Sequence, residues 1–280
     1  ESLAPIALED RWMLHRLAVA AQQVERSVEA RRLNDAAYAG YDCFWHEFCD
    51  WYLEAIKPRL RSEEAAERNT ALVVALTVHA QLLRLLHPFL PYITEELWHA
   101  HPATAGFVVT APMPRFVGDP PLAADAARFE LARELVGAIR NLRGELGVPP
   151  GKRGRALFRC EGGRAIDVQS VLEPIALLAK LETCEMLDGD PPAQSVTAVV
   201  GDIEVFLPLE GLVDLDQERK RLAKERDAVA KRLQGVRGKL SNEKFVGKAP
   251  AEVVAREREL EASLSETLTK LEGQLEALGG

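Results

Sequence analysis

Two lysines flank a phenylalanine in the stretch KLSNEKFVGKAPAEVV, residues 239–254, at Lys244, Phe245 and Lys248. Ammonium groups bind phosphate, and an exposed aromatic ring stacks on a base that is turned out of a strand. Phe245 has a second interpretation, as an apolar plug that folds back over the end of a helical hairpin. The residue types therefore predict either a nucleic-acid contact or a hydrophobic cap at this stretch.

The stretch lies at the end of a basic segment. Residues 214–248 hold 11 lysines and arginines and 6 acids, on a chain with a net charge of −8. A local block of this kind attracts phosphate although the whole chain is acidic. Its cations up to and including the first residue of the stretch are Arg219, Lys220, Arg221, Lys224, Arg226, Lys231, Arg232, Arg237 and Lys239. Some of them also fit the flanks of a coiled coil, paired with Glu257, Glu259, Glu261 and Glu266.

A second basic cluster lies in IRNLRGELGVPPGKRGR, residues 139–155. Guanidinium forks at a helix end suit phosphate oxygens and base edges. Cations in the last turn of a helix are also favoured by the helix dipole, which needs no ligand. Both interpretations stay open for its members Arg140, Arg143, Lys152, Arg153 and Arg155.

Catalytic signatures are absent from the sequence. There is no glycine-rich phosphate loop, no G-x-S-x-G and no cysteine–histidine arrangement. His99 and His101 are two residues apart on a short helix and should point to different faces, so we expect no zinc site. The cysteines form no C-x-x-C pair, and we expect four buried thiols in a reducing compartment: Cys43, Cys49, Cys160 and Cys184.

Membrane and targeting signals are also missing. No uninterrupted apolar run reaches the roughly 18 residues of a membrane span. The first residues contain neither a starting methionine nor the layout of a signal peptide. We therefore expect an internal or C-terminal piece of a longer protein.

Residues 1–150 predict a helical bundle. Apolar residues recur at helical spacing in 9–31, 63–86, 91–98 and 122–146. Asn34 is expected to cap the helix that follows it, and Pro58 to end that helix. The aromatic stripe of this helix favours core packing over a base-stacking platform; its members are Tyr41, Phe44, Trp45, Phe48, Trp51 and Tyr52.

Residues 151–280 predict two further parts. Short strands near 155–160, 183–188, 195–201 and 203–209, with a helical segment at 165–181, indicate a small α+β unit. A tight turn is expected at Gly201 and Asp202. From residue 212 the apolar residues recur seven apart, and a second leucine run follows residue 254. Each run buries one stripe, so together they predict an antiparallel helical hairpin of about 43 Å.

Several phrases together resemble the C-terminal part of bacterial valyl-tRNA synthetases. They are EDRWMLHRL, FWHEFCDWYLEAIKPRL, LLRLLHPFLPYITEELW, IRNLRGELGVPPGK and NEKFVGKAPAEVV, in that order. The resemblance covers essentially all 280 residues. It implies a mainly α protein with a helical anticodon-binding domain at 1–150, a small α+β junction domain at 151–211 and a coiled-coil tRNA-binding arm at 212–280. The catalytic and editing domains of that family would lie upstream.

The resemblance implies the tRNA-binding portion of a cytoplasmic valine–tRNA ligase, which joins valine to tRNA(Val) with ATP and Mg²⁺. It implies no cofactor, metal or catalytic residue in this piece, which alone would be inactive, no DNA or membrane partner, and a monomeric full-length enzyme. On the anticodon side the candidate contacts are Arg16, Arg31, Arg32, Asn34, Asp35, Arg140, Arg143, Lys152 and Arg153. On the arm they are Arg219, Lys220, Lys224, Arg232, Lys244, Phe245 and Lys248. The residues leave one alternative open, a structural protein that dimerises through its coiled coil.

Overall fold

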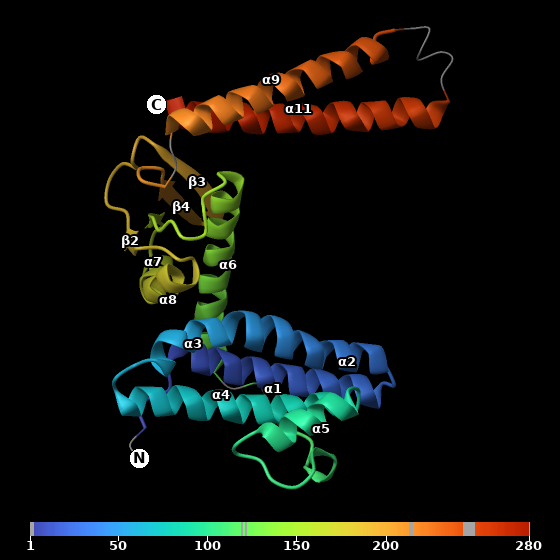
Figure 1. Cartoon of the computed structure of the whole chain (residues 1–280), viewed down its shortest axis with the longest axis vertical. Helices are drawn as coiled ribbons and strands as arrows, with labels where there is room; N and C mark the ends of the chain where they lie inside the picture. The colour runs from blue at the N-terminus through green and yellow to red at the C-terminus, as the bar shows by residue number, and fades with distance from the viewer. Residues whose placement is uncertain (1–2, 119, 121, 213–214, 243–249, 280) are drawn as a thin grey trace. The chain divides into compact units, whose positions relative to one another are not determined.

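The computed structural model describes residues 3–118, 120, 122–212, 215–242 and 250–279 and divides into two compact units (Figure 1). Unit 1 contains Glu1–Glu134 and Ser170–Leu178, and unit 2 contains Leu135–Gln169 and Ala179–Gly280. The boundary passes through helix α6 (Ala123–Glu145). The helical bundle, the small sheet and the helical hairpin are all present, which confirms the predicted fold class.

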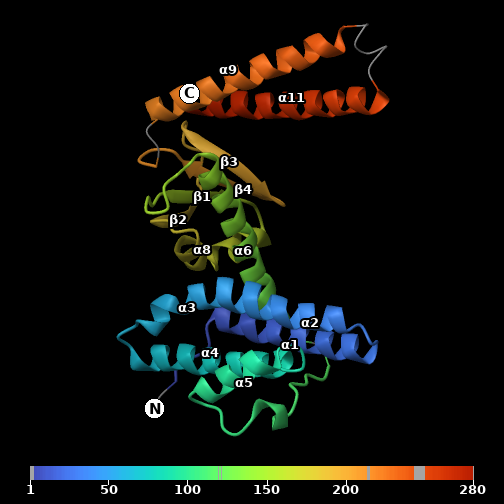
Figure 2. The same cartoon turned by 45° about the vertical axis from the view of Figure 1, so that its right-hand side comes forward.

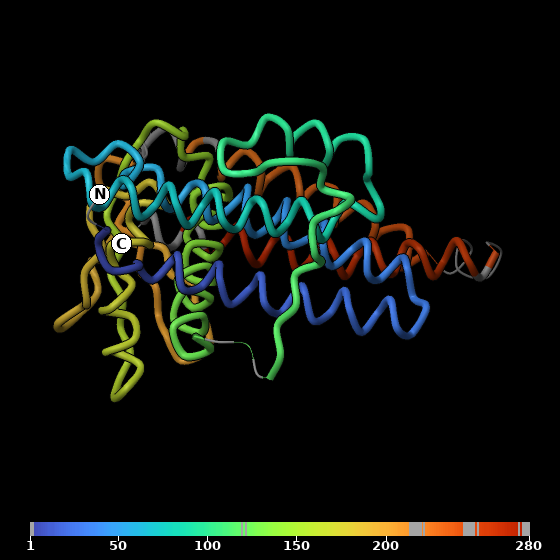
Figure 3. The backbone as a smooth tube through the Cα atoms, turned by 90° about the horizontal axis from the view of Figure 1, so that it is seen from below, coloured from blue at the N-terminus to red at the C-terminus, as the bar shows by residue number. Residues whose placement is uncertain are grey.

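Unit 1 is a helical bundle (Figure 2). Its first and fourth helices run along each other, drawn in blue and cyan in Figure 3. Trp12 of the first helix lies against Phe129 of α6, with ring centroids 4.7 Å apart, and both side chains are fully buried. The helices are α1 (Leu8–Glu29), α2 (Leu33–Asp42), π-helical η1 (Cys43–Tyr52), α3 (Leu53–Leu60), α4 (Ala65–Leu86), α5 (Pro91–Ala100), 3₁₀-helical η2 (Val108–Thr110) and α8 (Leu172–Leu178).

Helix α4 is the most apolar element of the bundle. By length and composition alone it would pass as a membrane span, but it packs against α1 and α3, and half of its most apolar window is buried. The helical spacing of Leu72, Leu76, Leu83 and Leu86 predicts that these four form the buried stripe of this helix. That prediction was partly wrong, because Leu72 is 46% exposed while Val74 and Val78 are buried. A helix that is apolar on most of its circumference does not show from its period which side meets the core.

Helices α2, η1 and α3 follow one another without a break from Leu33 to Leu60. Asn34 does not cap α2, since the capping position is Arg32 and no side chain caps the helix there. Pro58 lies inside α3, which ends two residues later, so its role as the terminator was also wrong. The π-helical turns of η1 were not expected, because nothing in its residue spacing distinguishes them from α-helix.

The cysteines differ from the expectation. All four thiols are free, but only Cys43 is buried, and the other three are half-buried. Burial raises the pKa of the Cys43 thiol well above its usual value and that of Cys184 to about 12. Both thiols are therefore protonated near neutral pH, which makes them poor nucleophiles.

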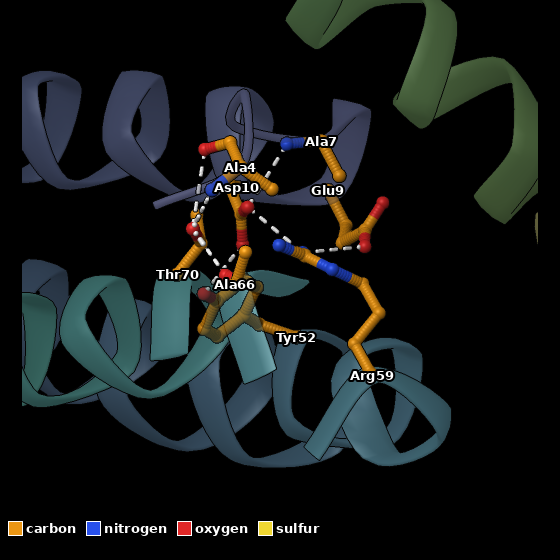
Figure 4. Close-up of polar contacts among 8 residues, drawn as sticks. All are labelled: Ala4, Ala7, Glu9, Asp10, Tyr52, Arg59, Ala66 and Thr70. Atoms are coloured by element: carbon orange, nitrogen blue, oxygen red, sulfur yellow. Dashed lines mark hydrogen bonds and ion pairs between the residues drawn. The ribbon is translucent and has the colours of Figure 1, made fainter. Parts of the chain in front are cut away.

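A buried polar network joins the start of α1 to η1 and α3 (Figure 4). Asp10 is fully buried, and its Oδ2 accepts from Arg59 Nη1 at 2.8 Å and from the Ala7 backbone N–H at 3.0 Å. Its Oδ1 accepts from the Tyr52 hydroxyl at 2.8 Å. Arg59 Nη1 also donates to Glu9 Oε1 at 2.9 Å. Burial raises the pKa of Glu9 in spite of this partner. The network satisfies a carboxylate that would otherwise be costly to bury.

The segment before α1 is held to α4 by Thr70. The Ala4 backbone N–H donates to Thr70 Oγ1 at 2.9 Å, and this hydroxyl lies within donating distance of the carbonyl oxygens of Ala4 and Ala66 (Figure 4). Thr70 is 2% exposed. The contact fixes how the chain enters the bundle.

Three rings form a column in the bundle core. His79 stacks on Phe48 with centroids 6.0 Å apart and on His101 with centroids 5.3 Å apart. His101 Nε2 donates to the Leu76 carbonyl at 3.1 Å, and its Nδ1 accepts from the Ala103 backbone N–H at 3.2 Å. Burial and, secondarily, the neighbouring His101 lower the pKa of His79.

We expect unit 1 to lose stability as the pH falls below about 6.5. The unfolded chain takes up a proton on His79 near the ordinary histidine pKa of 6.5, whereas the folded chain does so only at lower pH. The contribution is therefore fully present above the unfolded pKa and is lost as the pH falls toward the folded one. Urea unfolding followed by tryptophan fluorescence at about pH 7.5 and 5.5 measures this. Between these two pH values the His79→Gln variant should lose less stability than wild type. An equal loss in both proteins would mean that groups other than His79 cause the pH dependence.

Unit 2 contains a mixed sheet of four strands with the order β2-β1-β4-β3. The strands are β1 (Arg155–Arg159), β2 (Thr183–Met186), β3 (Ser195–Val200) and β4 (Ile203–Pro208). β1 and β2 are parallel, and the chain between them includes α7 (Gly163–Gln169) and α8; the other pairs are antiparallel. Gly201 has a φ of 61° at the turn before β4, which confirms the predicted Gly201–Asp202 turn.

Helices α9 (Leu215–Leu240) and α11 (Ala251–Gly279) lie side by side in unit 2 (Figure 1). Arg237 pairs with Glu261 and Lys239 with Glu257, so the partner's number falls as the position on α9 rises, which confirms the antiparallel arrangement. The seam is buried within the chain and consists of Leu233, Val236 and Leu264, with Val229, Leu240, Leu260 and Leu268 packed against it. The apolar stripes of α9 and α11 therefore bury each other within one chain. This argues against the alternative that they serve to form a dimer.

Candidate nucleic-acid interface

Three lysines of α9 project away from the seam. Lys220, Lys224 and Lys231 are exposed, and no carboxylate among the described side chains pairs with them. At about 100° per residue they lie within roughly 40° of one another and about 180° from the seam. Among the described residues, the members of this lysine row make no ion pair with α11. It presents a line of positive charge to solvent.

Other cations of α9 do belong to the hairpin, as the coiled-coil interpretation proposed. Arg237 and Lys239 each bond a glutamate of α11 at 2.9 Å. Arg226 pairs with its neighbour Asp227 at 2.6 Å. Exposed pairs of this kind contribute little to stability. Arg232 of α9 is exposed to solvent.

The turn between α1 and α2 brings four candidates of unit 1 together. Arg31, Arg32, Asn34 and Asp35 are all exposed, and Arg31 has a φ of 58°, in the left-handed region. Arg32 Nη1 lies 3.5 Å from Asp35 Oδ2. The turn thus offers guanidinium and amide donors at one end of the bundle.

Arg16 is engaged inside the bundle. Its Nε and Nη2 both approach Glu47 Oε1, at 2.7 and 2.5 Å, and Glu47 is buried. Hydrogen bonding to Glu47 and its charge outweigh burial and raise the pKa of Arg16. The side chain is about one-third exposed. Its first role in this structure is to neutralise Glu47.

The candidates of unit 2 near residue 150 also differ in exposure. Arg143 is only 7% exposed, and its Nη2 donates to the Lys152 carbonyl at 2.7 Å. Burial lowers the pKa of Arg143. Arg143 fastens the connector after α6, and its burial leaves little of the side chain for a surface contact. Lys152 Nζ donates to the Gly211 carbonyl at 3.1 Å, while Arg140 and Arg153 are exposed.

An aromatic surface on α2 and η1 was missed. Trp45 is 49% exposed and Tyr41 45%, so their assignment to the core was wrong. Tyr38 is 66% exposed on the same face. The sequence did contain a signal for which side packs inward, because small residues recur on the opposite face at Ala36, Gly40 and Cys43. Such residues allow close packing, and a Cβ added at Gly40 would lie 3.2 Å from Leu86 Cδ2.

Two family models match the chain. The anticodon-binding domain of tRNA ligases matches residues 10–157. The chain belongs to this family. The tRNA-binding arm of valyl-tRNA synthetases matches residues 214–279. Together they confirm the resemblance to the C-terminal part of valyl-tRNA synthetases.

The chain is also similar to whole proteins, and the relatives given below are all valine–tRNA ligases. It is 41% identical over 277 residues to a valine–tRNA ligase of Syntrophotalea carbinolica and 39% identical over 275 residues to one of Geobacter sulfurreducens. A valine–tRNA ligase of Aquifex aeolicus is 37% identical over 290 residues. The matches cover 98%, 96% and 99% of this chain but 31%, 31% and 25% of the relatives. The chain thus spans less than a third of their length.

The candidate contacts on the anticodon side belong to both units. Unit 1 holds the turn residues and Arg16, and unit 2 holds those near residue 150. On the arm, Lys220, Lys224 and Arg232 are exposed. Lys244, Phe245 and Lys248 and the side chain of Arg219 lie outside the described residues. The contact at the tip of the hairpin stays a prediction.

Proposed function

We propose that the chain is the tRNA-binding C-terminal portion of a valine–tRNA ligase, which joins valine to tRNA(Val) using ATP and Mg²⁺. The lysine row of α9 carries the proposal, because it is a line of exposed cations that pair with no described carboxylate, on a segment that matches the arm family. In this proposal ATP and Mg²⁺ bind elsewhere in a monomeric, cytoplasmic enzyme. The partner of this chain is tRNA(Val), with neither DNA nor a membrane as a partner.

The proposed division of labour follows from the chemistry of RNA. Sequence is readable where bases are unpaired, so the bundle would bind the anticodon loop. Paired stems present phosphate and sugar, which suit a row of ammonium groups. Successive lysines of the row are about 6 and 10 Å apart along the helix axis. The arm would thus add affinity without reading sequence.

Removing the lysine row should weaken tRNA binding and reduce its salt dependence. Replacing Lys220, Lys224 and Lys231 by alanine deletes up to three phosphate contacts. The slope of log K against log salt should then fall in magnitude by about 2–3. The loss should be similar for all tRNAs. Filter binding or anisotropy at several salt concentrations measures both quantities.

Lys270→Ala is the matched control for this prediction. Lys270 lies on α11 and pairs with Glu266 of the same helix at 2.8 Å. Its removal should leave the salt slope unchanged. A triple variant with wild-type affinity and slope would refute the role of the lysine row.

The chain alone should not activate valine. Its sequence lacks the signatures of a nucleotide-binding catalytic domain, so we expect no valine-dependent exchange of pyrophosphate into ATP. The same preparation should bind tRNA in the assay above, which shows that it is folded. Exchange above background would place a catalytic site in these residues and contradict the proposal.

A further inference from the structure

We propose that Tyr38, Tyr41 and Trp45 form a stacking row for unpaired RNA bases. This inference rests on the proposed function and adds a binding surface to it. The three side chains are 66%, 45% and 49% exposed. They follow Asn34 at intervals of four, three and four residues, so they share one side of the α2–η1 helix with it. The row spans about 10 Å along the helix, and Asn34 of the polar turn lies about 6 Å before its first member.

The rings are arranged for stacking. Tyr41 and Trp45 are parallel within 5°, with their centroids 6.4 Å apart. His46 meets Tyr41 edge-on at 6.3 Å. Parallel exposed faces accept flat bases in one common orientation, which a run of successive unpaired nucleotides can supply. The buried side of this helix is formed by other residues, among them Ala36, Cys43 and Phe48, so the three exposed rings are not part of the bundle core.

The charges around the row favour bases over phosphate. Arg31 and Arg32 are exposed at its first end. Asp42 follows Tyr41 directly in the sequence, and Asp50, which is 3.3 Å from His46 Nδ1, comes one helical turn beyond Trp45. Carboxylates repel a phosphate backbone, so the strand would turn its bases toward the rings and its phosphates toward solvent and the arginines. Recognition of this kind depends little on base identity and little on salt.

The test is binding of the full chain to a synthetic RNA hairpin with an unpaired loop of about seven nucleotides, compared with a blunt RNA duplex. Trp45→Ala and Tyr41→Ala should each raise the dissociation constant for the hairpin by roughly 5- to 100-fold. The salt slope should not change, because a neutral ring releases no counterions. Trp45→Phe should recover most of the affinity, and duplex binding should be the same for all variants.

Tyr92→Ala is the matched control, since Tyr92 of α5 is 89% exposed and lies outside the row. It should bind the hairpin as wild type does. Wild-type affinity of both Tyr41→Ala and Trp45→Ala would overturn the stacking row and leave the proposed function intact. A change in the sedimentation of the free chain, with unchanged RNA affinity, would assign the row to a protein contact and also overturn it. Absence of hairpin and tRNA binding by wild type would overturn the proposed function itself.

Discussion

Replacing Arg59 by methionine should lower the free energy of unfolding of unit 1 by about 3–5 kcal/mol. The change removes the charge that faces Asp10 and Glu9, whose side chains are 0% and 12% exposed. Asp10 keeps the Tyr52 hydroxyl and the Ala7 N–H, which cannot neutralise it. Glu9 loses its cation although burial has already raised its pKa. Breaking a buried pair is therefore costly even where the intact pair adds little.

Urea unfolding followed by tryptophan fluorescence measures this loss. All four tryptophans, Trp12, Trp45, Trp51 and Trp98, belong to unit 1, so the signal reports on that unit. Arg61→Met is the matched control, because Arg61 is exposed two residues further on. Adding Asp10→Asn to Arg59→Met should recover part of the loss, since it removes one uncompensated charge. If Arg59→Met and Arg61→Met unfold alike, the network does not stabilise the bundle.

The pH dependence of the Arg59→Met variant gives an independent check. Without the guanidinium, which now lowers it, the pKa of the Glu9 carboxyl group should rise further. A raised pKa in the folded state means that the contribution is present at low pH and lost as the pH rises through the folded pKa. The deficit relative to wild type should therefore shrink at acidic pH. A deficit that is constant with pH would point to lost packing rather than unpaired charge.

Leu264→Asp should separate α9 from α11. Leu264 is 8% exposed and packs with Leu233 and Val236 in the seam. The substitution removes apolar burial and places a carboxylate between the helices, at a cost of at least about 3 kcal/mol. A helical hairpin has few contacts apart from its seam, so the loss should appear as local unfolding of both helices. Far-ultraviolet circular dichroism and its melting profile measure the helical content that disappears.

Ser263→Asp controls for the added charge, because Ser263 is exposed next to the seam. It should leave the helical content unchanged. Tryptophan fluorescence supplies a second control, since unit 1 should unfold as in wild type in both variants. Unchanged helicity and melting in Leu264→Asp would mean that this seam does not hold the hairpin together.

The hairpin is the part that the sequence determined most completely. Its apolar residues recur at one spacing over many turns, and the chain reverses once between the two runs. Each run has a single apolar stripe, so the nearest partner of Leu233 was the other run, and the sequence left a second copy of the chain as the alternative. The residues that line the seam, including Val236 and Leu264, were therefore predictable from local spacing.

The bundle could be predicted as a set of helices but not as a packing. Helical period shows which residues share a side, and it does not show which side meets the core. Tyr41 and Trp45 share a side with each other, and that side faces solvent because the other side, with Gly40 close to Leu86, packs into the bundle. Large aromatic side chains suggest burial on average, but the opposite face was needed for close helix contact.

Tertiary structure alone decided which charged residues remain available. Arg59 meets Asp10 across 49 positions of sequence, and Arg16 meets Glu47 across 31. Arg143 is buried against the Lys152 carbonyl, whereas Lys220 and Lys224 stay exposed. In sequence these cations look alike, because composition and spacing describe a residue and its neighbours along the chain. Whether a cation is free for a phosphate depends on the carboxylate or carbonyl that folding brings to it.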